Sequence, residues 1–364
     1  PVGACIQINV DRVFNIGKLP KHSNNKYSIN KLKNVGFIYC IFRVNIYLIM
    51  ITITIMGGLG NQLFQIFTTI AAAIRNHDTF FFMEYKDLPG NPGHPRHTHW
   101  STIFRGLRRY LTPSNAITDK MFNSLARWDE IGFQHTPVPT ETNKYTKPLR
   151  LHGYFQSEKY FVDKYAEICA MLQLSQQQSW IKNIYGSETW SSDYPASPQK
   201  SRILVSTHFR IGDSVLNLHI HPVMSVEYYY RALSHIISTT TTTPPLRYSF
   251  LVFYEPCDKN IVLKHVAALK HRCATDTTGP AYGRDIEFHF VRDTIADWQQ
   301  LLLMSVCDHN IIANSTFSWW GAYFNANPAK IVCYPSIWFG PGVSHDTRDL
   351  CPESWVKVEA TASV

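Results

Sequence analysis

The 364-residue sequence contains no Cys-x-x-Cys pair and no Asp-x-Asp pair. Its eight cysteines are scattered along the chain, so the spacing indicates neither a disulfide framework nor a cysteine zinc site. Without Asp-x-Asp, the chain lacks the carboxylate pair that commonly holds a divalent metal against a diphosphate. We therefore predict no metal site and no tightly bound cofactor.

Positive charge is scarce outside the N-terminal region. The formal net charge is +8, and residues 1–49 hold seven Lys or Arg and one Asp, so they carry +6 of it (7 − 1). The rest of the chain then carries about +2 (8 − 6), which does not indicate a basic nucleic-acid surface. Its apolar content, 45% of the whole sequence, is sufficient for a sizeable core.

The first 49 residues show no clear periodicity, and we expect a disordered or non-core extension there. Residues 35–56 are apolar but are interrupted by Arg43 and Asn45. Because residues 51–56 are needed as a first strand, about 15 remain, fewer than the ~20 that span a bilayer. The sole glycosylation sequon, at Asn314, lies inside a ligand-like motif. We expect a cytoplasmic protein without membrane association; the alternative is an anchor through residues 35–56.

Strand patterns alternate with helix patterns in two series separated by a polar stretch with two prolines, residues 187–200. Such alternation predicts parallel sheets. We expect Rossmann-like domains at 50–186 and 201–345, a linker at 187–200 and a C-terminal tail at 346–364. The expected strands cover 51–56, 79–83, 149–154, 203–208, 248–254, 286–291 and 310–313. The expected helices cover 157–172, 225–238, 261–269, 298–305 and 317–324.

The strand at 51–56 is followed by Gly-Gly-Leu-Gly-Asn-Gln-Leu-Phe-Gln at 57–65. Apolar residues then recur at helical spacing, so the segment is typical of a strand, a glycine turn and a helix. Gly58 and Gly60 permit a close backbone approach to a ligand, and the helix N-terminus aims N–H groups at it. Asn61 and Gln62 are placed to orient a substrate. The alternative is that the glycines only form the turn between strand and helix and bind no ligand.

A second block, residues 205–213, contains His208, Arg210 and Asp213 directly after an expected strand. Ligands of α/β sheets bind at the carboxyl ends of strands, and a planar guanidinium suits a phosphate. Arg210 is therefore the candidate cation for a diphosphate. The alternative is that Arg210 pairs with Asp213 in a purely structural role.

A third block follows the expected strand at 310–313 and opens a helix with Ser315, Thr316 and Ser318. Small hydroxyls and free N–H groups at a helix N-terminus form an anion site. The alternative is that one hydroxyl serves only as an N-cap. Trp319 and Trp320, which follow, are expected to pack in the core.

Four blocks in the same order, residues 57–65, 152–161, 205–213 and 307–323, resemble the α-1,2-fucosyltransferases of glycosyltransferase family 11. The resemblance implies a GT-B fold, with two Rossmann-like domains facing across a cleft. It implies an acceptor-side N-terminal domain and a C-terminal domain that binds GDP-fucose. The implied reaction moves L-fucose, with inversion and without metal, from GDP-fucose to the 2-hydroxyl of a terminal β-galactose.

The resemblance also implies roles for individual residues. His208 lies near the nucleotide, Arg210 binds the diphosphate, and Asp297 contacts guanine. An inverting transfer further needs a general base, for which Asp213 and Glu158 are the candidates. A helix-capping role is the alternative for both Asp297 and Glu158.

Two positions depart from the family pattern. Ile211 replaces the second arginine of the family's His-x-Arg-Arg-x-Asp block, and Glu255 stands where Ser-Asp-Asp is usual. Losing one of two cations weakens the expected stabilisation of the diphosphate. Two alternatives therefore stay open: a fucosyltransferase with another acceptor, and a catalytically silent nucleotide- or sugar-binding module.

Overall fold

The computed structural model describes residues 50–85, 87–88, 96–112, 117–139, 148–185, 202–212, 218–240 and 247–362. The expected extension at 1–49, the expected linker at 187–200 and Asp213 lie outside these ranges. Within them, none of the helices combines the length and the apolar character that crossing a membrane requires.

A four-stranded parallel sheet forms the N-terminal half, in the order β2-β1-β8-β7. Its strands are β1 (Met50–Ile53), β2 (Thr79–Phe80), β7 (Ala126–Asp129) and β8 (Leu149–His152). The expected first strand is thus confirmed as a central strand, paired with β2 on one side and β8 on the other. The glycine motif leads into α3 (Leu59–Asn76).

The expected strand over 79–83 is two strands in different sheets. β2 ends at Phe80, while β3 (Phe82–Met83) pairs with β6 (Leu111–Thr112). A further small antiparallel pair joins β4 (Asp87–Leu88) to β5 (Arg96–His97). The apolar run at 79–83 predicted one continuous strand. In the structure the chain passes from one sheet to the next at Phe81.

A six-stranded parallel sheet forms the C-terminal half, in the order β11-β10-β9-β12-β13-β14. Its strands are β9 (Arg202–His208), β10 (Arg247–Phe253), β11 (Ile286–Phe290), β12 (His309–Ile311), β13 (Val332–Pro335) and β14 (Val356–Val358). In chain order this is 3-2-1-4-5-6, the order of the doubly wound Rossmann fold. The direction of winding reverses between β9 and β12, where ligands of such sheets bind.

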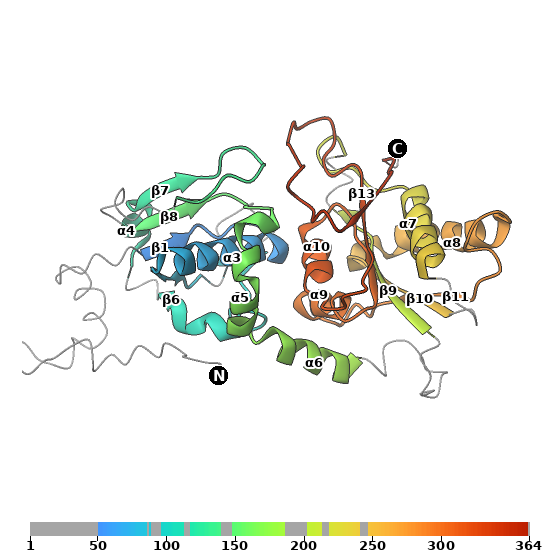
Figure 1. The fold of residues 1–364 in the computed structure, drawn as a ribbon, viewed down its shortest axis with the longest axis horizontal. Coiled ribbons are helices and arrows are strands. Elements are labelled where there is room, and N and C mark those ends of the chain that lie inside the picture. The colour runs from blue at the N-terminus through green and yellow to red at the C-terminus, as the bar shows by residue number, and fades with distance from the viewer. Residues whose placement is uncertain are drawn as a thin grey trace, which may run out of the picture. The chain divides into compact units, whose positions relative to one another are not determined.

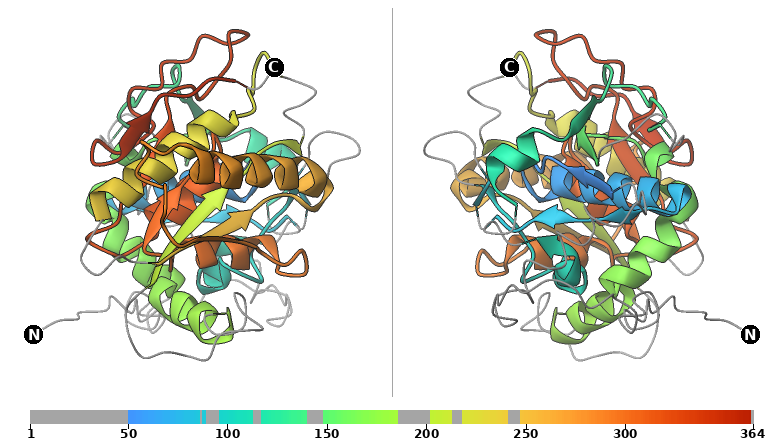
Figure 2. Two further views of the ribbon diagram at one scale, coloured as in Figure 1. Left: turned by 90° about the vertical axis from the view of Figure 1, so that its right-hand side faces the viewer. Right: turned by 90° about the vertical axis from the view of Figure 1, so that its left-hand side faces the viewer.

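Helices cover both faces of the six-stranded sheet (Figure 1). One face carries α7 (Val226–Thr240) and α8 (Lys259–Thr275), which Figure 2 shows lying across the strands. The other face carries α9 (Asp297–Met304) and α10 (Thr316–Tyr323). Around the first sheet lie α4 (Asp119–Asn123), α5 (Tyr165–Leu172) and the 3-10 helices η2 (Arg105–Tyr110), η4 (Glu158–Tyr160) and η5 (Val162–Lys164). Helix α6 (Leu174–Tyr185) instead packs against α9, with the Trp180 ring 5.8 Å from Trp298. A last 3-10 turn, η7 (Pro256–Asp258), precedes α8.

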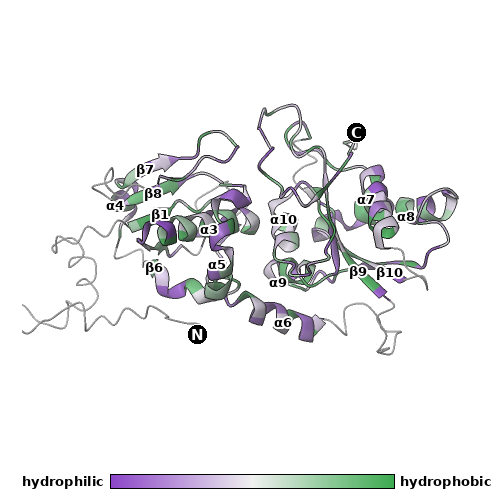
Figure 3. Ribbon diagram, viewed as in Figure 1, coloured by the Kyte–Doolittle hydropathy of each residue, from purple (hydrophilic) through white to green (hydrophobic). Residues whose placement is uncertain are grey.

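Strands β9, β10 and β12 are buried along most of their length, as strands covered on both faces must be, and Figure 3 shows the apolar segments of the fold in green. An aromatic cluster joins α3 to α10: the Phe64 ring lies 4.5 Å from Trp319 and the Phe67 ring 4.6 Å from Trp320. Both tryptophans are fully buried, which confirms their expected core role. The cluster packs the first helix of one sheet against a helix of the other.

Two further expectations about elements were wrong. The helix expected over 157–172 is continuous only in α5; η4 and η5 precede it. The segment expected as a C-terminal tail, 346–364, contributes β14 to the sheet and buries Trp355 beside Trp319. Three- and four-residue strands such as β13 and β14 are too short for a periodic pattern. The expected α/β class with two parallel sheets is confirmed.

Candidate functional site

Two loops meet where the winding of the six-stranded sheet reverses. Arg210 lies just beyond β9, and Asn314 lies just beyond β12, the neighbouring parallel strand. Arg210 Nη1 donates a hydrogen bond to the Asn314 carbonyl, at 2.8 Å. Asn314 is itself buried and its Nδ2 donates to the carbonyls of Pro222 and Trp338. The guanidinium is thus attached to a fixed backbone at the carboxyl edge of the sheet.

His208, the last residue of β9, lies beside this arginine and is buried. Burial, together with the positive charge of Arg210, lowers the pKa of His208 to about 3. The imidazole is therefore neutral at physiological pH. Its ring centre lies 5.7 Å from that of Phe317 in the first turn of α10, and its Nδ1 is buried without a hydrogen-bond partner among the described residues.

The N-terminus of α10 supplies the second part of the site. Ser315 occupies the N-cap position, but its side chain makes no capping hydrogen bond. Ser318 is buried and its hydroxyl donates to the Ser315 carbonyl at 3.3 Å, so it is committed to the helix. Ser315 and Thr316 are partly exposed. The first-turn N–H groups of a helix have no intrahelical partner, so this end offers donors and partial positive charge to an anion.

The glycine turn lies directly against this helix end. A Cβ added at Gly60 would lie 2.4 Å from the Thr316 backbone carbon, whereas one at Gly58 would meet nothing within 4 Å. Gly57 has φ of 75°, a left-handed conformation that glycine accepts readily. The close approach expected at the glycines is therefore made to the α10 backbone at Gly60. It brings the N-termini of α3 and α10 together.

The amides after the glycine turn have separate roles. Gln62 is buried and its Nε2 donates to the carbonyls of Gly57 and His97, so it holds the turn. Asn61 is partly exposed and its Oδ1 accepts a hydrogen bond from Gln156 Nε2 at 3.0 Å. Of the two, only Asn61 is placed to face a substrate.

Glu158 and Asp297 have other contacts in the described part of the chain, and their expected roles stay predictions. Glu158 lies beside Tyr323 and Lys330, at the carboxyl end of α10. Asp297 begins α9, with 61% of its side chain exposed, and its Oδ2 lies 3.7 Å from His99 Nε2. The third carboxylate, Asp213, lies outside the described residues, so a general base at the site stays a prediction.

The two departures from the expected blocks have different surroundings. Ile211 is 2% exposed and belongs to the apolar core under the sheet, where a second guanidinium would be buried. Glu255 is exposed, and its Oε2 would lie 3.0 Å from a Cβ at Gly212. The carboxylate therefore remains at the carboxyl edge of the sheet, in the loop after the neighbouring strand β10. It faces Gly212, which follows Arg210 by two residues.

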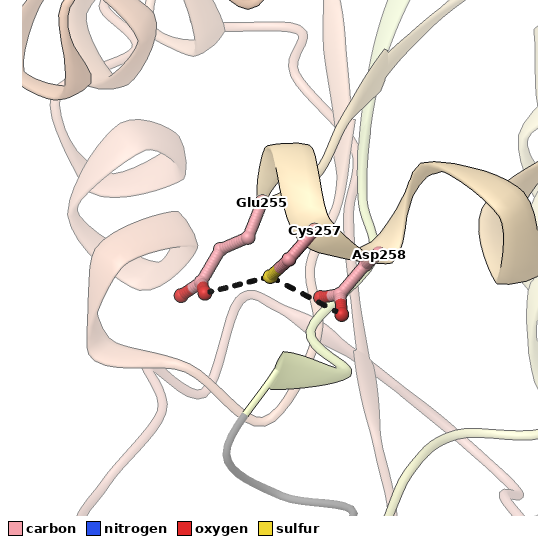
Figure 4. Close-up of side chains that lie close together, drawn as sticks. All are labelled: Glu255, Cys257 and Asp258. Carbon is pink, nitrogen blue, oxygen red and sulfur yellow. Dashed lines mark hydrogen bonds between the residues drawn. The ribbon is translucent and has the colours of Figure 1, made fainter.

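One group of possible metal ligands is present among the described residues, Glu255, Cys257 and Asp258 (Figure 4). Cys257 Sγ lies 3.9 Å from Glu255 Oε2 and 3.7 Å from Asp258 Oδ1. Asp258 is buried, and its other oxygen accepts a hydrogen bond from the Gly212 N–H at 2.7 Å. This hydrogen bond indicates that the Asp258 carboxylate holds the backbone after Arg210 in place.

A cavity of about 400 Å³ opens beyond β13, a size typical of small-molecule sites. Its lining includes the buried Trp338, His345 and the oppositely charged pair Asp346 and Arg348. Trp338 is also the residue whose carbonyl accepts from Asn314. The cavity is thus connected to the residue that holds Arg210 by the hydrogen bond from the Asn314 side chain to the Trp338 carbonyl.

Sequence reasoning missed two residues of this site. Asn314 was noted only as a sequon, although an amide between a strand and a helix start is a signal for loop anchoring. Gln156 lies in the block at 152–161, but nothing in a single sequence shows that it reaches Asn61, 95 residues away.

Part of the chain matches a known family. Residues 284–339 match the profile of glycosyl transferase family 11. This segment runs from the end of the loop before β11 to the loop after β13, and it includes Asp297 and the α10 N-terminus.

Two curated proteins of Escherichia coli are similar in sequence. One is an alpha-1,2-colitosyltransferase, 22% identical over 321 residues that cover 83% of this chain and 97% of the relative. The other is the O-antigen biosynthesis glycosyltransferase WbnK, 28% identical over 158 residues, which are 42% of this chain and 44% of the relative. Together with the family match, these similarities support a glycosyltransferase related to family 11.

Solved structures with a similar course of the chain include FUT1 of Arabidopsis thaliana in complex with GDP. It has a TM-score of 0.47 and 12% identity, over 92% of this chain and 86% of that one. Fucosyltransferase NodZ from Bradyrhizobium has a TM-score of 0.34 and 12% identity, over 75% of this chain and 92% of that one.

Proposed function

We propose that the protein is an inverting fucosyltransferase that moves L-fucose from GDP-fucose to the 2-hydroxyl of a terminal β-galactose. The observation that carries the proposal is Arg210, held on the Asn314 carbonyl beside the N-terminus of α10. Both lie where the winding of a Rossmann-like sheet reverses. A fixed cation and a helix N-terminus at that place fit the diphosphate of a nucleotide sugar.

In the proposed reaction the acceptor oxygen forms a bond to the anomeric carbon of fucose while the bond to the GDP β-phosphate oxygen breaks. Negative charge then develops on the diphosphate. Arg210 and the first N–H groups of α10 stabilise that charge, because they are in place before the reaction and need not reorganise. The acceptor proton passes to a general base, for which Asp213 is the proposed residue, and Asn61 orients the substrate.

His208 fits this arrangement as a neutral group. With its pKa near 3, it adds no positive charge to compete with Arg210 for the diphosphate. Gly60 keeps the α3 turn close to the same site, and Ser315 and Thr316 contribute hydroxyls. The proposed donor site thus uses residues from both sheets.

A second sugar-nucleotide donor should also be tested, because the similar E. coli protein is named as a colitosyltransferase and is matched over most of both chains. Another acceptor or another deoxysugar would change the pockets around the same transfer centre. The silent binding module also remains a competing proposal, because Ile211 leaves the site with one arginine where the family pattern has two.

The decisive experiment measures GDP release from GDP-fucose by the whole chain, with and without lactose. Release that requires lactose, with a fucosylated product carrying an α-1,2 linkage by NMR, supports the proposal. Turnover with other acceptors of an array but not with terminal galactosides would reassign the acceptor. Tight GDP-fucose binding without turnover on any acceptor would instead support the silent module.

A further inference from the structure

The four-stranded sheet has its own reversal of winding, between β1 and β8. The glycine turn follows β1 and leads to Asn61 in the first turn of α3, and the loop after β8 carries Gly153 to Gln156. Because β1 and β8 are parallel neighbours, the two loops meet at one edge. The hydrogen bond from Gln156 Nε2 to Asn61 Oδ1 joins them.

This bond fixes which end of the Asn61 amide is available. A primary amide has one carbonyl oxygen and one NH₂ group. Since the Oδ1 of Asn61 accepts from Gln156, the amide is oriented so that Nδ2 is its end for donation to another group. Nδ2 lies on the Gly57 side, where an added Cβ would come within 2.6 Å of it.

The backbone that presents Gln156 is strained. Phe155, directly before it, is fully buried and has φ of 54°, which is uncommon for an aromatic residue. The Glu130 carboxylate holds this conformation by accepting hydrogen bonds from the N–H groups of Tyr154, at 2.8 Å, and Phe155, at 2.9 Å. Backbone strain of this kind persists where surrounding structure enforces it, and it clusters at functional sites.

Burial of the Gln156 side chain also lowers the stability of the folded protein. It is 7% exposed, and its Oε1 is buried without a hydrogen-bond partner among the described residues. An unsatisfied buried acceptor destabilises a fold, and an apolar side chain of the same size would avoid that cost. A strained backbone and an unsatisfied amide therefore both serve one visible contact, the bond to Asn61.

We propose that Gln156 is a positioning residue, which acts on sugar transfer through Asn61 by holding its NH₂ group toward the substrate hydroxyls. The inference rests on the proposed function. Glu130 and the left-handed Phe155 set the direction of Gln156, and Gln156 sets the direction of the Asn61 amide. A hydrogen-bond donor oriented in this way holds an acceptor hydroxyl or donor sugar without a proton transfer of its own.

The test is a double-mutant cycle on turnover with Gln156→Ala, Asn61→Ala and the double variant. We expect each single variant to lower kcat about 10- to 100-fold, and the double variant to be no slower than Asn61→Ala, because both remove the same oriented donor. KM for GDP-fucose should change little. Multiplicative losses in the double variant would overturn the proposal, as would a normal kcat for Gln156→Ala.

Gln156→Glu separates position from packing. The glutamate has the same shape, but its carboxylate cannot donate to Asn61 Oδ1 and instead accepts from Nδ2, which turns the amide round. We expect kcat to fall as far as in Gln156→Ala while the melting temperature changes less. Full activity of Gln156→Glu would contradict the proposed orientation.

Gln177→Ala is the matched control. Gln177 is equally buried, donates through Nε2 to two carbonyls and has an Oε1 without a described partner, but it lies in α6. Its substitution should lower stability without lowering kcat of the folded protein. An equal kcat loss for Gln177→Ala would mean that any buried glutamine has this effect, and would overturn the assignment.

A readout without turnover keeps this inference separate from the proposed function. In a ¹⁵N spectrum, the side-chain NH₂ signals of Asn61, identified as those lost in Asn61→Asp, should shift in Gln156→Glu. If the Asn61 signals shift but the protein does not use GDP-fucose, the fucosyl proposal is contradicted and the contact between Gln156 and Asn61 is still supported. Unshifted Asn61 signals would overturn that relationship whatever the donor.

Discussion

Gly60 in α3 and Thr316 in α10 lie so close that a single methyl group at Gly60 would come within 2.4 Å of the Thr316 backbone. The two residues are 256 positions apart (316 − 60) in helices that belong to different sheets. Each lies in the first turn of its helix. The glycine therefore lets two helix N-termini meet at the proposed anion site.

Replacing Gly60 with alanine should destabilise the protein. We expect a loss of about 1–3 kcal/mol in the free energy of unfolding from overpacking, offset by the roughly 1 kcal/mol that alanine gains over glycine inside a helix. Urea denaturation measures the difference. Gly58→Ala is the control, because its Cβ meets nothing; as a weaker N-cap it should cost under about 1 kcal/mol. A Gly60→Ala protein more stable than the wild type, as helix propensity alone would make it, would refute the contact.

Arg210→Ala should lower kcat about 100- to 1000-fold, the usual effect of removing one donor to a developing anion. GDP binding should weaken as well, which isothermal titration can measure. Arg210→Lys keeps the charge but loses the planar fork, so we expect partial recovery. Arg231→Ala, at an exposed pair with Glu227, is the control and should change neither quantity. Wild-type turnover by a folded Arg210→Ala protein would rule out its role.

Stability should fall in acid partly because of His208. Its pKa is about 3 in the folded protein and about 6.5 when unfolded. Between these values the unfolded chain holds a proton that the folded protein lacks, so stability is full above pH 6.5 and falls as pH drops toward 3. The expected slope from this one group is about 1.4 kcal/mol per pH unit.

The measurement compares urea denaturation of wild type and His208→Gln at several pH values between 7.5 and 4. The variant should show a shallower loss of stability, because glutamine does not titrate. Substitution of the exposed His271 with glutamine is the control. Parallel curves for wild type and His208→Gln would contradict the assignment of this acid sensitivity to His208.

Turnover should persist in EDTA, because the sequence has no Asp-x-Asp pair and Arg210 with the α10 N-terminus can take over the stabilisation of the diphosphate. If chelation abolished turnover and Mn²⁺ or Mg²⁺ restored it, the proposed mechanism would fail. The group at Glu255, Cys257 and Asp258 would then be the first site to examine. In that case Glu255→Gln should raise the metal concentration needed for half activity.

The blocks that form the site could be predicted because each follows a strand. In parallel sheets the carboxyl ends gather at one edge, which is why Arg210 and Ser315, each directly after an expected strand, were both candidates for binding an anion. Their exact contact, through the Asn314 carbonyl, depends on how two loops cross and leaves no pattern in the sequence.

The contacts of the candidate carboxylates depend on packing between distant segments, which a single sequence does not show. Glu158 was a candidate general base through the family resemblance, and its neighbours Tyr323 and Lys330 lie more than 160 positions further along the chain. Asp297 pairs with His99, which lies in a loop that has no periodic signal. The C-terminal strand β14 escaped notice because three residues cannot show an alternation.

The position of β9 in the middle of its sheet has a consequence for synthesis on the ribosome. β9 gains β10 on one side soon after it is made, but its other edge waits for β12. Arg210 and its partner Asn314 are separated by 104 residues, which take about 5–20 s to translate. During that interval the nascent chain exposes an unpaired apolar strand edge, which is open to association with other chains. The strand whose carboxyl end leads to Arg210 thus keeps one side unpaired until β12 has been made.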